Sequence, residues 1–419
     1  MIVDTVSADY VGPMRLQQHD RAALAGEAGE GPRLAMGLLV AAAEAMGADG
    51  LLDISGAHID SCLYHGQAGL DFASLLAAAG ARVAVPTTLN VSSLDLLHPD
   101  LYRGSEAVRV AARDQMDAYE RMGCKPTWTC APYQLLDRPS LGEQVAWGES
   151  NAIVFANSVL GARTERYGDF LDICCAITGR APAVGLHTEA GRRASFELAV
   201  DVPAEWGDNE LLYVAVGHIL GQVAGTRVGL ITGLDDRATE DRLKALGAAA
   251  ASSGAVAMFH VSGVTPEAES IEHAIAQVVP VDRDRIASAL AALGPSESDL
   301  SAVSVGTPHA SADELETLAG LCAGQTTAIP FYVNTGRDVL DSVGDAVGLI
   351  EAFGATIVTD TCTYITPILS DTPGAVMTNS GKWAYYAPAN LGVEVVMGTL
   401  ADCVESAVTG RTITRGVLS

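Results

Sequence analysis

The sequence is poor in positive charge, in lysine and in long apolar runs. Among its 419 residues, 51 are acidic and 25 basic, which gives a formal net charge of −26. Because binding to nucleic acid needs a basic face, this charge balance predicts that nucleic acid is not a partner. Only Lys125, Lys244 and Lys382 are lysines. A lysine in a polar cleft would therefore be a conspicuous candidate for binding an anionic substrate.

The sequence also lacks a membrane-spanning segment, a secretion signal and any Cys-x-x-Cys motif. No apolar run reaches the ~18 residues that a membrane span needs, and the first residues resemble no signal peptide. We therefore expect a cytoplasmic protein with no membrane partner. The absence of a Cys-x-x-Cys pair disfavours a zinc ribbon and a thioredoxin-like redox site.

Eight cysteines are nevertheless present, and a disulfide framework is improbable without a secretion signal. Cys174, Cys175 and Cys322 lie in apolar helical patterns, which predicts buried core thiols. The roles of Cys62 and Cys124 stay open. The remaining three, Cys130, Cys362 and Cys403, are dispersed, the first two in expected loops and the last at the start of an expected terminal helix. Three such thiols fit an iron–sulfur site with one coordination position open.

Apolar runs that predict strands alternate with helical patterns along the chain. The helical patterns cover 32–46, 69–79, 115–122 and 170–178. The expected strands cover 50–54, 81–85, 127–130, 183–187, 227–231, 255–260, 301–305, 331–334 and 355–358. This alternation predicts an α/β fold with mostly parallel sheets, which bind ligands at the carboxyl ends of their strands. Polar stretches at 202–208 and 294–298 suggest three domains, 1–203, 204–296 and 297–419.

Polar side chains follow the first expected strands. Gly56, Ala57 and His58 precede Asp60 and His65, and two imidazoles with a carboxylate could bind a metal or a substrate carboxylate. The alternative is a set of polar loop caps.

A second polar group, Thr87-Thr88-Leu89-Asn90, offers hydroxyls and amides to an anion, or else forms a turn that satisfies its own backbone.

Two further clusters carry most of the remaining chemistry. Between 128 and 164 the chain offers Cys130, Ser150, Asn151 and an arginine, Arg163, that could hold a carboxylate bidentately.

The second of these clusters follows the expected strand 355–358. It contains Cys362 and then Asn379-Ser380-Gly381-Lys382, in which Ser380 and Lys382 could hold a carboxylate or a phosphate. The glycine spacing of a P-loop is absent.

Several of these motifs together resemble one known family, aconitase X, the divergent branch of the aconitase superfamily. The matching segments are Ala57-His58-Ile59-Asp60, Val85-Pro86-Thr87-Thr88-Leu89-Asn90, Thr129-Cys130-Ala131-Pro132-Tyr133, Trp147-Gly148-Glu149-Ser150-Asn151, Asn157-Ser158-Val159-Leu160-Gly161-Ala162-Arg163-Thr164, Gly306-Thr307-Pro308-His309 and Asp360-Thr361-Cys362. They run in order along nearly the whole chain.

The resemblance implies three α/β/α domains around an iron–sulfur site. A separate small subunit would supply a swivelling fourth domain, which carries a serine thought to act as the base. The resemblance also implies that Cys130, Cys362 and Cys403 hold a [4Fe-4S] or [2Fe-2S] cluster or a mononuclear iron. The iron would act as a Lewis acid in the removal of water from a small hydroxy-carboxylic acid.

Two substrates are known for the family: cis-3-hydroxy-L-proline, which gives Δ1-pyrroline-2-carboxylate, and mevalonate 5-phosphate. The composition, rich in Ala and Arg and poor in Lys, suggests a bacterial source and favours hydroxyproline. We expect His58, His65 and Lys382 to be catalytic. The expected substrate contacts are Gly56, Ala57, His58, Thr87, Thr88, Ser150, Asn151, Arg163, Ser380 and Lys382.

Two other functions remain open from the sequence. One is a non-catalytic iron–sulfur sensor. The other is a metal-dependent hydrolase built on His58, Asp60 and His65, which would not depend on Cys130.

Overall fold

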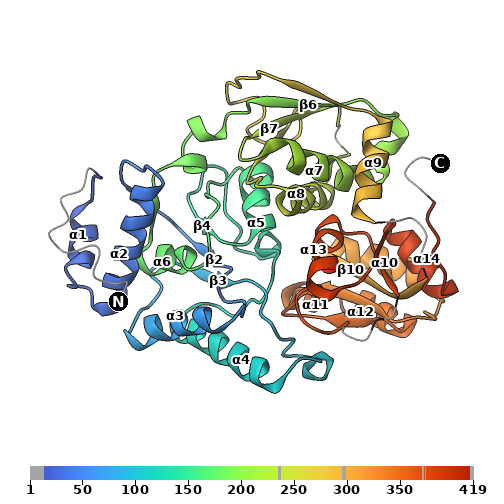
Figure 1. Cartoon of the computed structure of the whole chain (residues 1–419), viewed down its shortest axis with the longest axis horizontal. Coiled ribbons are helices and arrows are strands. Elements are labelled where there is room, and N and C mark those ends of the chain that lie inside the picture. Colours follow the sequence, from blue (N-terminus) through green and yellow to red (C-terminus); the bar gives the residue numbers. More distant parts are fainter. Residues whose placement is uncertain (1–13, 235–236, 295–298, 370–371, 373, 416–419) are drawn as a thin grey trace.

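The computed structural model describes residues 14–234, 237–294, 299–369, 372 and 374–415 (Figure 1). Three units follow one another along this part of the chain, each built around a parallel sheet with helices packed on it. In Figure 1 the first unit runs from blue to green, the second from green to yellow, and the third from orange to red. The structure confirms the predicted α/β fold class with parallel sheets.

The first unit contains a three-stranded parallel sheet of order β3-β2-β4 and an antiparallel pair, β1-β5. Its elements are α1 (Gln18–Leu24), α2 (Glu30–Ala45), β1 (Leu51–Asp53), β2 (Ala57–Ile59), α3 (Gln67–Ala78), β3 (Thr87–Leu89), α4 (Glu106–Arg121), β4 (Ala146–Trp147), α5 (Ser150–Phe155), α6 (Leu171–Thr178) and β5 (Arg180–Pro182). Helix α2 forms where the sequence predicted it, because Leu34, Leu39 and Ala43 recur at helical spacing and bury one stripe.

Three strands predicted in this unit are wrong, because 81–85, 127–130 and 183–187 form no strand; the last lies just after β5 and includes a short 3-10 helix. The backbone N–H groups of Val83 and Ala84 donate instead to the carbonyls of Met122 and Ala176, near the ends of two helices. The strand forms a few residues later, as β3, in the segment that we expected to be a strand-end loop. A short apolar run reveals an extended segment but not its hydrogen-bond partners, which lie far away in sequence.

The second unit is a four-stranded parallel sheet of order β8-β7-β6-β9. Its elements are β6 (Phe196–Val200), α7 (Glu210–Ala224), β7 (Gly229–Thr232), α8 (Glu240–Ser253), β8 (Phe259–Val261), β9 (Val278–Val281) and α9 (Arg283–Leu293). Helices α7 and α8 approach closely at Gly217, where a Cβ atom would lie 2.1 Å from the carbonyl oxygen of Leu246. Strand β6 already belongs to this sheet, so the chain enters the second unit before the proposed boundary at 203/204.

The third unit is a five-stranded parallel sheet of order β12-β11-β10-β13-β14. Its elements are β10 (Leu300–Ala310), α10 (Ala312–Cys322), β11 (Phe331–Thr335), α11 (Arg337–Ser342), α12 (Gly344–Phe353), β12 (Thr356–Val358), β13 (Ala375–Thr378), α13 (Gly381–Leu391), β14 (Val395–Met397) and α14 (Leu400–Thr409). The proposed boundary at 296/297 lies outside the described residues, as do residues 1–13, where no signal peptide was predicted.

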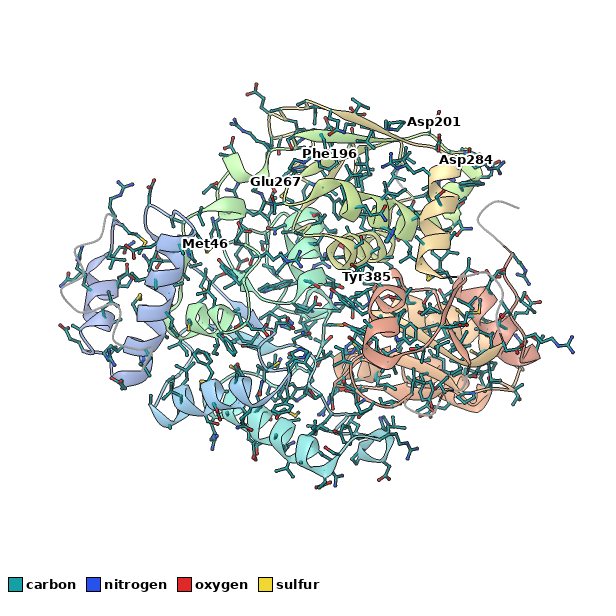
Figure 2. All side chains as sticks on the ribbon, viewed as in Figure 1. Met46, Phe196, Asp201, Glu267, Asp284 and Tyr385 are labelled. Carbon is teal, nitrogen blue, oxygen red and sulfur yellow. The ribbon has the colours of Figure 1, made fainter. Side chains whose placement is uncertain are left out.

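Figure 2 shows the side chains of the described residues on the ribbon. The buried apolar ones form three large clusters, one centred on each unit, and the cluster of the second unit also includes residues of the first and third. The units are also joined through helices. Helix α5 of the first unit packs on α8 of the second, and α13 of the third packs on α8 as well. Trp383 and Ala387 of α13 belong to the core of the second unit. The start of α13, which carries Lys382, is therefore fixed by packing against a neighbouring unit.

Candidate active site

The carboxyl ends of the first and third sheets lie against each other. Beyond β2 and β4 stand Asp60 and Glu149, while Cys362 and Lys382 follow β12 and β13. Contacts across the two units join Cys130 to Cys362 and Glu149 to Lys382. This is the position at which parallel α/β sheets bind ligands.

Two thiols and one imidazole form a compact group at this junction. The Cys130 and Cys362 sulfurs lie 4.0 Å apart. Ligand atoms of Cys130, His309 and Cys362 all lie within 4.8 Å of one another, and the three residues are buried. This is the one such group among the described residues that could hold a metal ion. Thiolates and imidazoles bind transition metals well, so the donor set fits iron and also zinc.

The charge state of the thiols supports metal binding. Burial opposes ionisation of Cys130, but the hydrogen bond from Cys362, together with His309 and Lys382, lowers its pKa to about 6. The pKa of Cys362 is raised well above its usual value, because it shares this hydrogen bond with Cys130 and is buried. One thiolate is thus already favoured at neutral pH, and thiolates are the form that binds metal.

Hydrogen bonds fix the third member of the group, His309, at the end of β10. Thr129 Oγ1 lies 3.1 Å from Nδ1 of His309, and the carbonyl oxygen of Thr361 lies 3.1 Å from Nε2. The backbone N–H of His309 donates to the sulfur of Cys130 at 3.3 Å. The imidazole is therefore held between the Cys130 loop and the Cys362 loop.

A salt bridge holds the Cys362 loop in place. Asp360 has a left-handed backbone, with φ at 60°, which is uncommon for a residue other than glycine. Its carboxylate accepts two hydrogen bonds from Arg337, at 2.6 and 2.5 Å, and one from the backbone N–H of Leu96 at 3.0 Å. Bidentate arginine pairs are strong and directional, so this arrangement orients the loop that carries Cys362.

Beside the thiols lies a buried ion pair between Lys382 and Glu149. Their side chains are 3% and 5% exposed. Glu149 also caps α5 by accepting from Ala152 N at 2.9 Å, and it accepts from the Asn151 amide. Although burial opposes the charge of Lys382, Glu149 and the nearby Tyr364 and Cys130 raise its pKa well above the usual value. Lys382 is therefore a cation at neutral pH.

The end of β2 contributes His58 and Asp60. His58 is fully buried, and its Nδ1 shares a hydrogen bond of 2.8 Å with Thr88 Oγ1. Burial lowers the pKa of His58 to about 3, so its ring is neutral. Asp60 is half-buried and accepts a hydrogen bond from the Asn90 amide. Burial and the negative charge of Glu149 raise the pKa of Asp60 to about 8.

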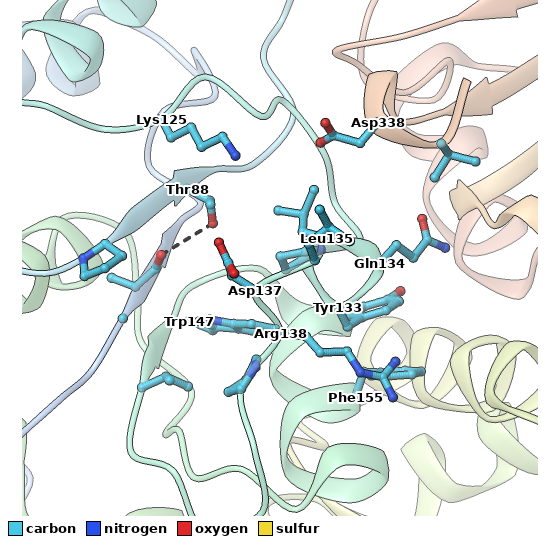
Figure 3. A pocket seen from close by; sticks show the side chains of 18 of the residues that line it. Thr88, Lys125, Tyr133, Gln134, Leu135, Asp137, Arg138, Trp147, Phe155 and Asp338 are labelled. Carbon is cyan, nitrogen blue, oxygen red and sulfur yellow. Dashed lines mark hydrogen bonds between the residues drawn. The ribbon is translucent and has the colours of Figure 1, made fainter. Parts of the chain in front are cut away.

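A cavity of about 1230 Å³ lies to one side of the first sheet and reaches all three units (Figure 3). Gly56, Ala57, Thr87 and Thr88 line it, and Figure 3 shows Lys125 at its wall. A second cavity, of about 690 Å³, is lined by Ser380 and by parts of the second and third units.

The structure distributes the predicted site residues over several places. It brings Lys382, Asn151 and Ser150 together around Glu149. Ser380 is the N-cap of α13 and accepts from Trp383 N at 3.1 Å. His65 lies exposed before α3, away from the described metal group. Arg163 lies 3.6 Å from Glu267 and donates to the carbonyl of His187, so its guanidinium already has partners.

The metal group differs from the predicted one, because His309 rather than Cys403 lies with Cys130 and Cys362. Cys403 lies in α14, where its side chain packs in the apolar core of the third unit. Burial raises its pKa well above the usual value, so this thiol resists ionisation. The helical period of α14 directs Cys403 into the core together with Val404 and Ala407.

Two residues of the site, His309 and Glu149, were not assigned a role from the sequence, and Asp60 was considered only together with His58 and His65. His309 lies near the end of the long strand β10. The family motif Gly306-Thr307-Pro308-His309 was the only feature of the sequence that could have pointed to this histidine. The rival hydrolase site of His58, Asp60 and His65 is not found as a metal group in the described part of the chain. The described helices include none that is long and apolar enough to span a membrane.

Comparison with known proteins gives consistent matches along the chain. Family profiles described as the aconitase X first, second and third domains match residues 13–190, 196–291 and 300–409. A cis-3-hydroxy-L-proline dehydratase of Pseudomonas aeruginosa is 43% identical over 96% of this chain and 71% of its own length. The phosphomevalonate dehydratase large subunit of Methanosarcina mazei is 34% identical over 95% of this chain and 98% of its own length. The holo-form crystal structure of Thermococcus kodakaraensis aconitase X superposes with a TM-score of 0.85 at 31% identity, covering 94% of this chain and 100% of that one.

Proposed function

The chain belongs to the aconitase X family, and from that premise we propose that it is the metal-binding part of a hydro-lyase that dehydrates cis-3-hydroxy-L-proline. The substrate assignment rests on the degree of sequence identity to known dehydratases. Two relatives named cis-3-hydroxy-L-proline dehydratase are 43% and 40% identical over 96% and 95% of the chain. The relatives named phosphomevalonate dehydratase large subunit are 30–36% identical.

Dehydration of mevalonate 5-phosphate is the second candidate. It is favoured by length, because the chain covers 98% of the Methanosarcina mazei large subunit but 71% of the Pseudomonas aeruginosa relative.

We propose that a separate small subunit supplies the part that the two hydroxyproline relatives have in addition, including the base that removes the α-proton. The support is the name and the end-to-end match of the large-subunit relatives. The expected result is that the chain alone does not turn over substrate and that adding the small subunit restores turnover. Substantial turnover by the chain alone would contradict this.

We propose that Cys130, His309 and Cys362 bind iron, either as a mononuclear centre or as a [4Fe-4S] or [2Fe-2S] cluster. The fit rests on three buried donors in one place and on the lowered pKa of Cys130. Bound iron would supply Lewis-acid assistance to the departure of the hydroxyl group.

Lys382 would hold the carboxylate of the substrate. Its ammonium group has three N–H donors, and among the described residues it donates to Glu149 alone. Two donors thus remain for a substrate carboxylate. A cation at that position stabilises the negative charge that develops on the carboxylate when the neighbouring carbon loses its proton. Ser150, which donates to the same Glu149 at 3.2 Å, is a further contact.

Four of the remaining predicted contacts, Gly56, Ala57, Thr87 and Thr88, line the large cavity, and we retain them as candidates for the path by which substrate enters. We also propose a cytoplasmic location, because all eight cysteines are free thiols, as expected in a reducing compartment. The three domains, 1–203, 204–296 and 297–419, stay a proposal as well, with the first boundary expected before β6 because that strand pairs in the second sheet.

The test uses anaerobically purified chain together with its small subunit. Dehydration of cis-3-hydroxy-L-proline is followed by the appearance of Δ1-pyrroline-2-carboxylate, with mevalonate 5-phosphate as the competing substrate. Turnover of the first substrate alone supports the proposal. Turnover of the second alone would replace it with the second candidate, and a bound metal without turnover of either would favour the non-catalytic sensor.

A further inference from the structure

Asp60 is the one carboxyl group of the site that is neither ion-paired to a cation nor engaged at both oxygens in the described structure. It follows β2 directly, at the carboxyl end of the first sheet, and its side chain is half-buried. Glu149 and Lys382 lie close enough for their charges to act on it. Asp60 is therefore close enough to the proposed carboxylate anchor, Lys382, for the charge of the ammonium group to act on it.

Hydrogen bonds orient this carboxyl group. The Asn90 amide donates to its Oδ1, whereas among the described residues Oδ2 has no hydrogen-bond partner. Because an N–H donor requires an acceptor, Oδ1 is the carbonyl oxygen of the acid, and the proton resides on Oδ2. The free oxygen is thus the one that can donate.

The surroundings of Asn90 and His58 keep this arrangement fixed. The Asn90 side chain lies beside the imidazole of His58, which is held on its other side by Thr88. Asn90 acts on the His58 ring as a hydrogen-bonding group, so the imidazole and the amide support each other beside Asp60.

The backbone of Asp60 is also held in place. Asp172 accepts from the N–H groups of Asp60 and Ser61, at 2.8 and 3.0 Å. At Gly148, a Cβ atom would lie 2.9 Å from Asp172 Oδ2 and 3.1 Å from the Asp60 Cβ. The end of β4 can therefore approach Asp60 only because residue 148 is glycine, and this places Glu149 next to it.

We propose that the Asp60 carboxylic acid delivers the proton that converts the leaving hydroxyl group of the substrate into water. The inference rests on the proposed function. The base on the small subunit takes the α-proton, and the C–H electron pair forms the new C=C bond. The C–O bond breaks with its electron pair on oxygen, and that oxygen takes the Oδ2 proton. The Asp60 carboxylate that remains is reprotonated from water.

The groups that face Asp60 favour its neutral form. Burial and the acids Glu149, Asp169 and Asp172 raise its pKa to about 8, and Lys382 opposes them. The two other titratable neighbours are His58, neutral because burial lowers its pKa, and Cys62, a thiol whose pKa is raised by burial. A carboxyl group with these neighbours carries a proton at neutral pH, as a general acid must.

The test compares two leaving groups. Chloride departs without a proton, so cis-3-chloro-L-proline needs no acid, whereas cis-3-hydroxy-L-proline does. We expect D60N to lower kcat for the hydroxy substrate about 100-fold or more, which is the usual contribution of a general acid, and to leave kcat for the chloro substrate within about threefold. The matched control is D169N, which removes an exposed acid nearby. It should keep the wild-type kcat for the hydroxy substrate at neutral pH.

Equal losses on both substrates, or no loss on either, would overturn the proposal. A second measurement uses the unaltered enzyme and so holds even if D60N does not fold. With the hydroxy substrate, kcat should fall as pH rises through about 8, and with the chloro substrate it should not fall there. The same fall for both substrates contradicts the assignment. Failure of the proposed function would be distinct, because the unaltered enzyme would then process neither proline.

Discussion

Replacing Glu149 tests how strongly the buried ion pair supports the site. In E149Q the ammonium of Lys382, which is 3% exposed, loses its carboxylate partner. Leaving one charge of a buried pair without its partner costs about 3–5 kcal/mol. For a chain of 419 residues unfolding as one unit, the entropy of unfolding is about 0.9 kcal/mol/K, so the expected decrease in Tm is about 3–6 °C.

The double variant E149Q/K382M removes both charges and should recover part of this loss. Its decrease in Tm should be smaller than the sum of the two single decreases, because the penalty of the unpaired charge is counted in each single variant. The measurement is differential scanning calorimetry of all three variants at one pH and one salt concentration.

The surface pair Arg113–Asp117 is the matched control, since its side chains are 47% and 46% exposed. An exposed pair contributes about 0–1 kcal/mol, so D117N should lower Tm by about 1 °C or less. If E149Q lowered Tm no more than D117N, or if the two single effects simply added, the reasoning about the buried pair would be refuted.

Three further predictions concern the metal group, the packing and the dependence on pH. C362S and H309N should each lose most of the bound iron, as measured by elemental analysis. C403S should keep its iron and only lower Tm, because Cys403 packs in the core. Loss of iron from C403S would show that Cys403 is a ligand. G148A should lower the stability by about 1–3 kcal/mol through overpacking against Asp60 and Asp172, measured by thermal unfolding, and an unchanged Tm would contradict the close contact. Burial lowers the pKa of His58 to about 3 and that of His187 and His260 to about 4, so the unfolded chain binds more protons below pH 6.5. The stability should therefore fall as pH decreases from about 6.5 to 4, by up to about 1.4 kcal/mol per pH unit for each histidine. H187Q should make the fall in Tm shallower, and an unchanged slope would argue against a neutral buried His187.

The sequence pattern predicted the fold class and most helices because both depend on local periodicity. Helix α2 and helix α6 lie within two residues of the predicted limits, since their apolar residues recur at helical spacing. The strands near 85 and 129 were misplaced, because a strand is defined by a partner, and the partners of Val83 and Ala84 are distant helix ends. Periodicity carries no information on such pairings.

The sequence predicted those site residues whose side-chain type is rare and chemically specific. Cys130 and Cys362 stood out as loop thiols and meet in the structure, and a rare lysine, Lys382, lies beside them. His309 and Glu149 did not stand out, because a histidine at a strand end and a glutamate before a helix are ordinary local features. Glu149 and Lys382 are 233 residues apart in sequence, and only the facing edges of two sheets bring them together.

The central claim is that a metal held by Cys130, His309 and Cys362 serves the dehydration of a hydroxyproline. It is tested most directly by measuring iron content and cis-3-hydroxy-L-proline turnover on the same anaerobic preparation of the chain with the proposed small subunit, unaltered and as H309N. The account predicts iron and turnover in the unaltered enzyme and loss of both in H309N. An H309N enzyme that keeps its iron and its full activity would contradict it, as would an active enzyme that contains no iron.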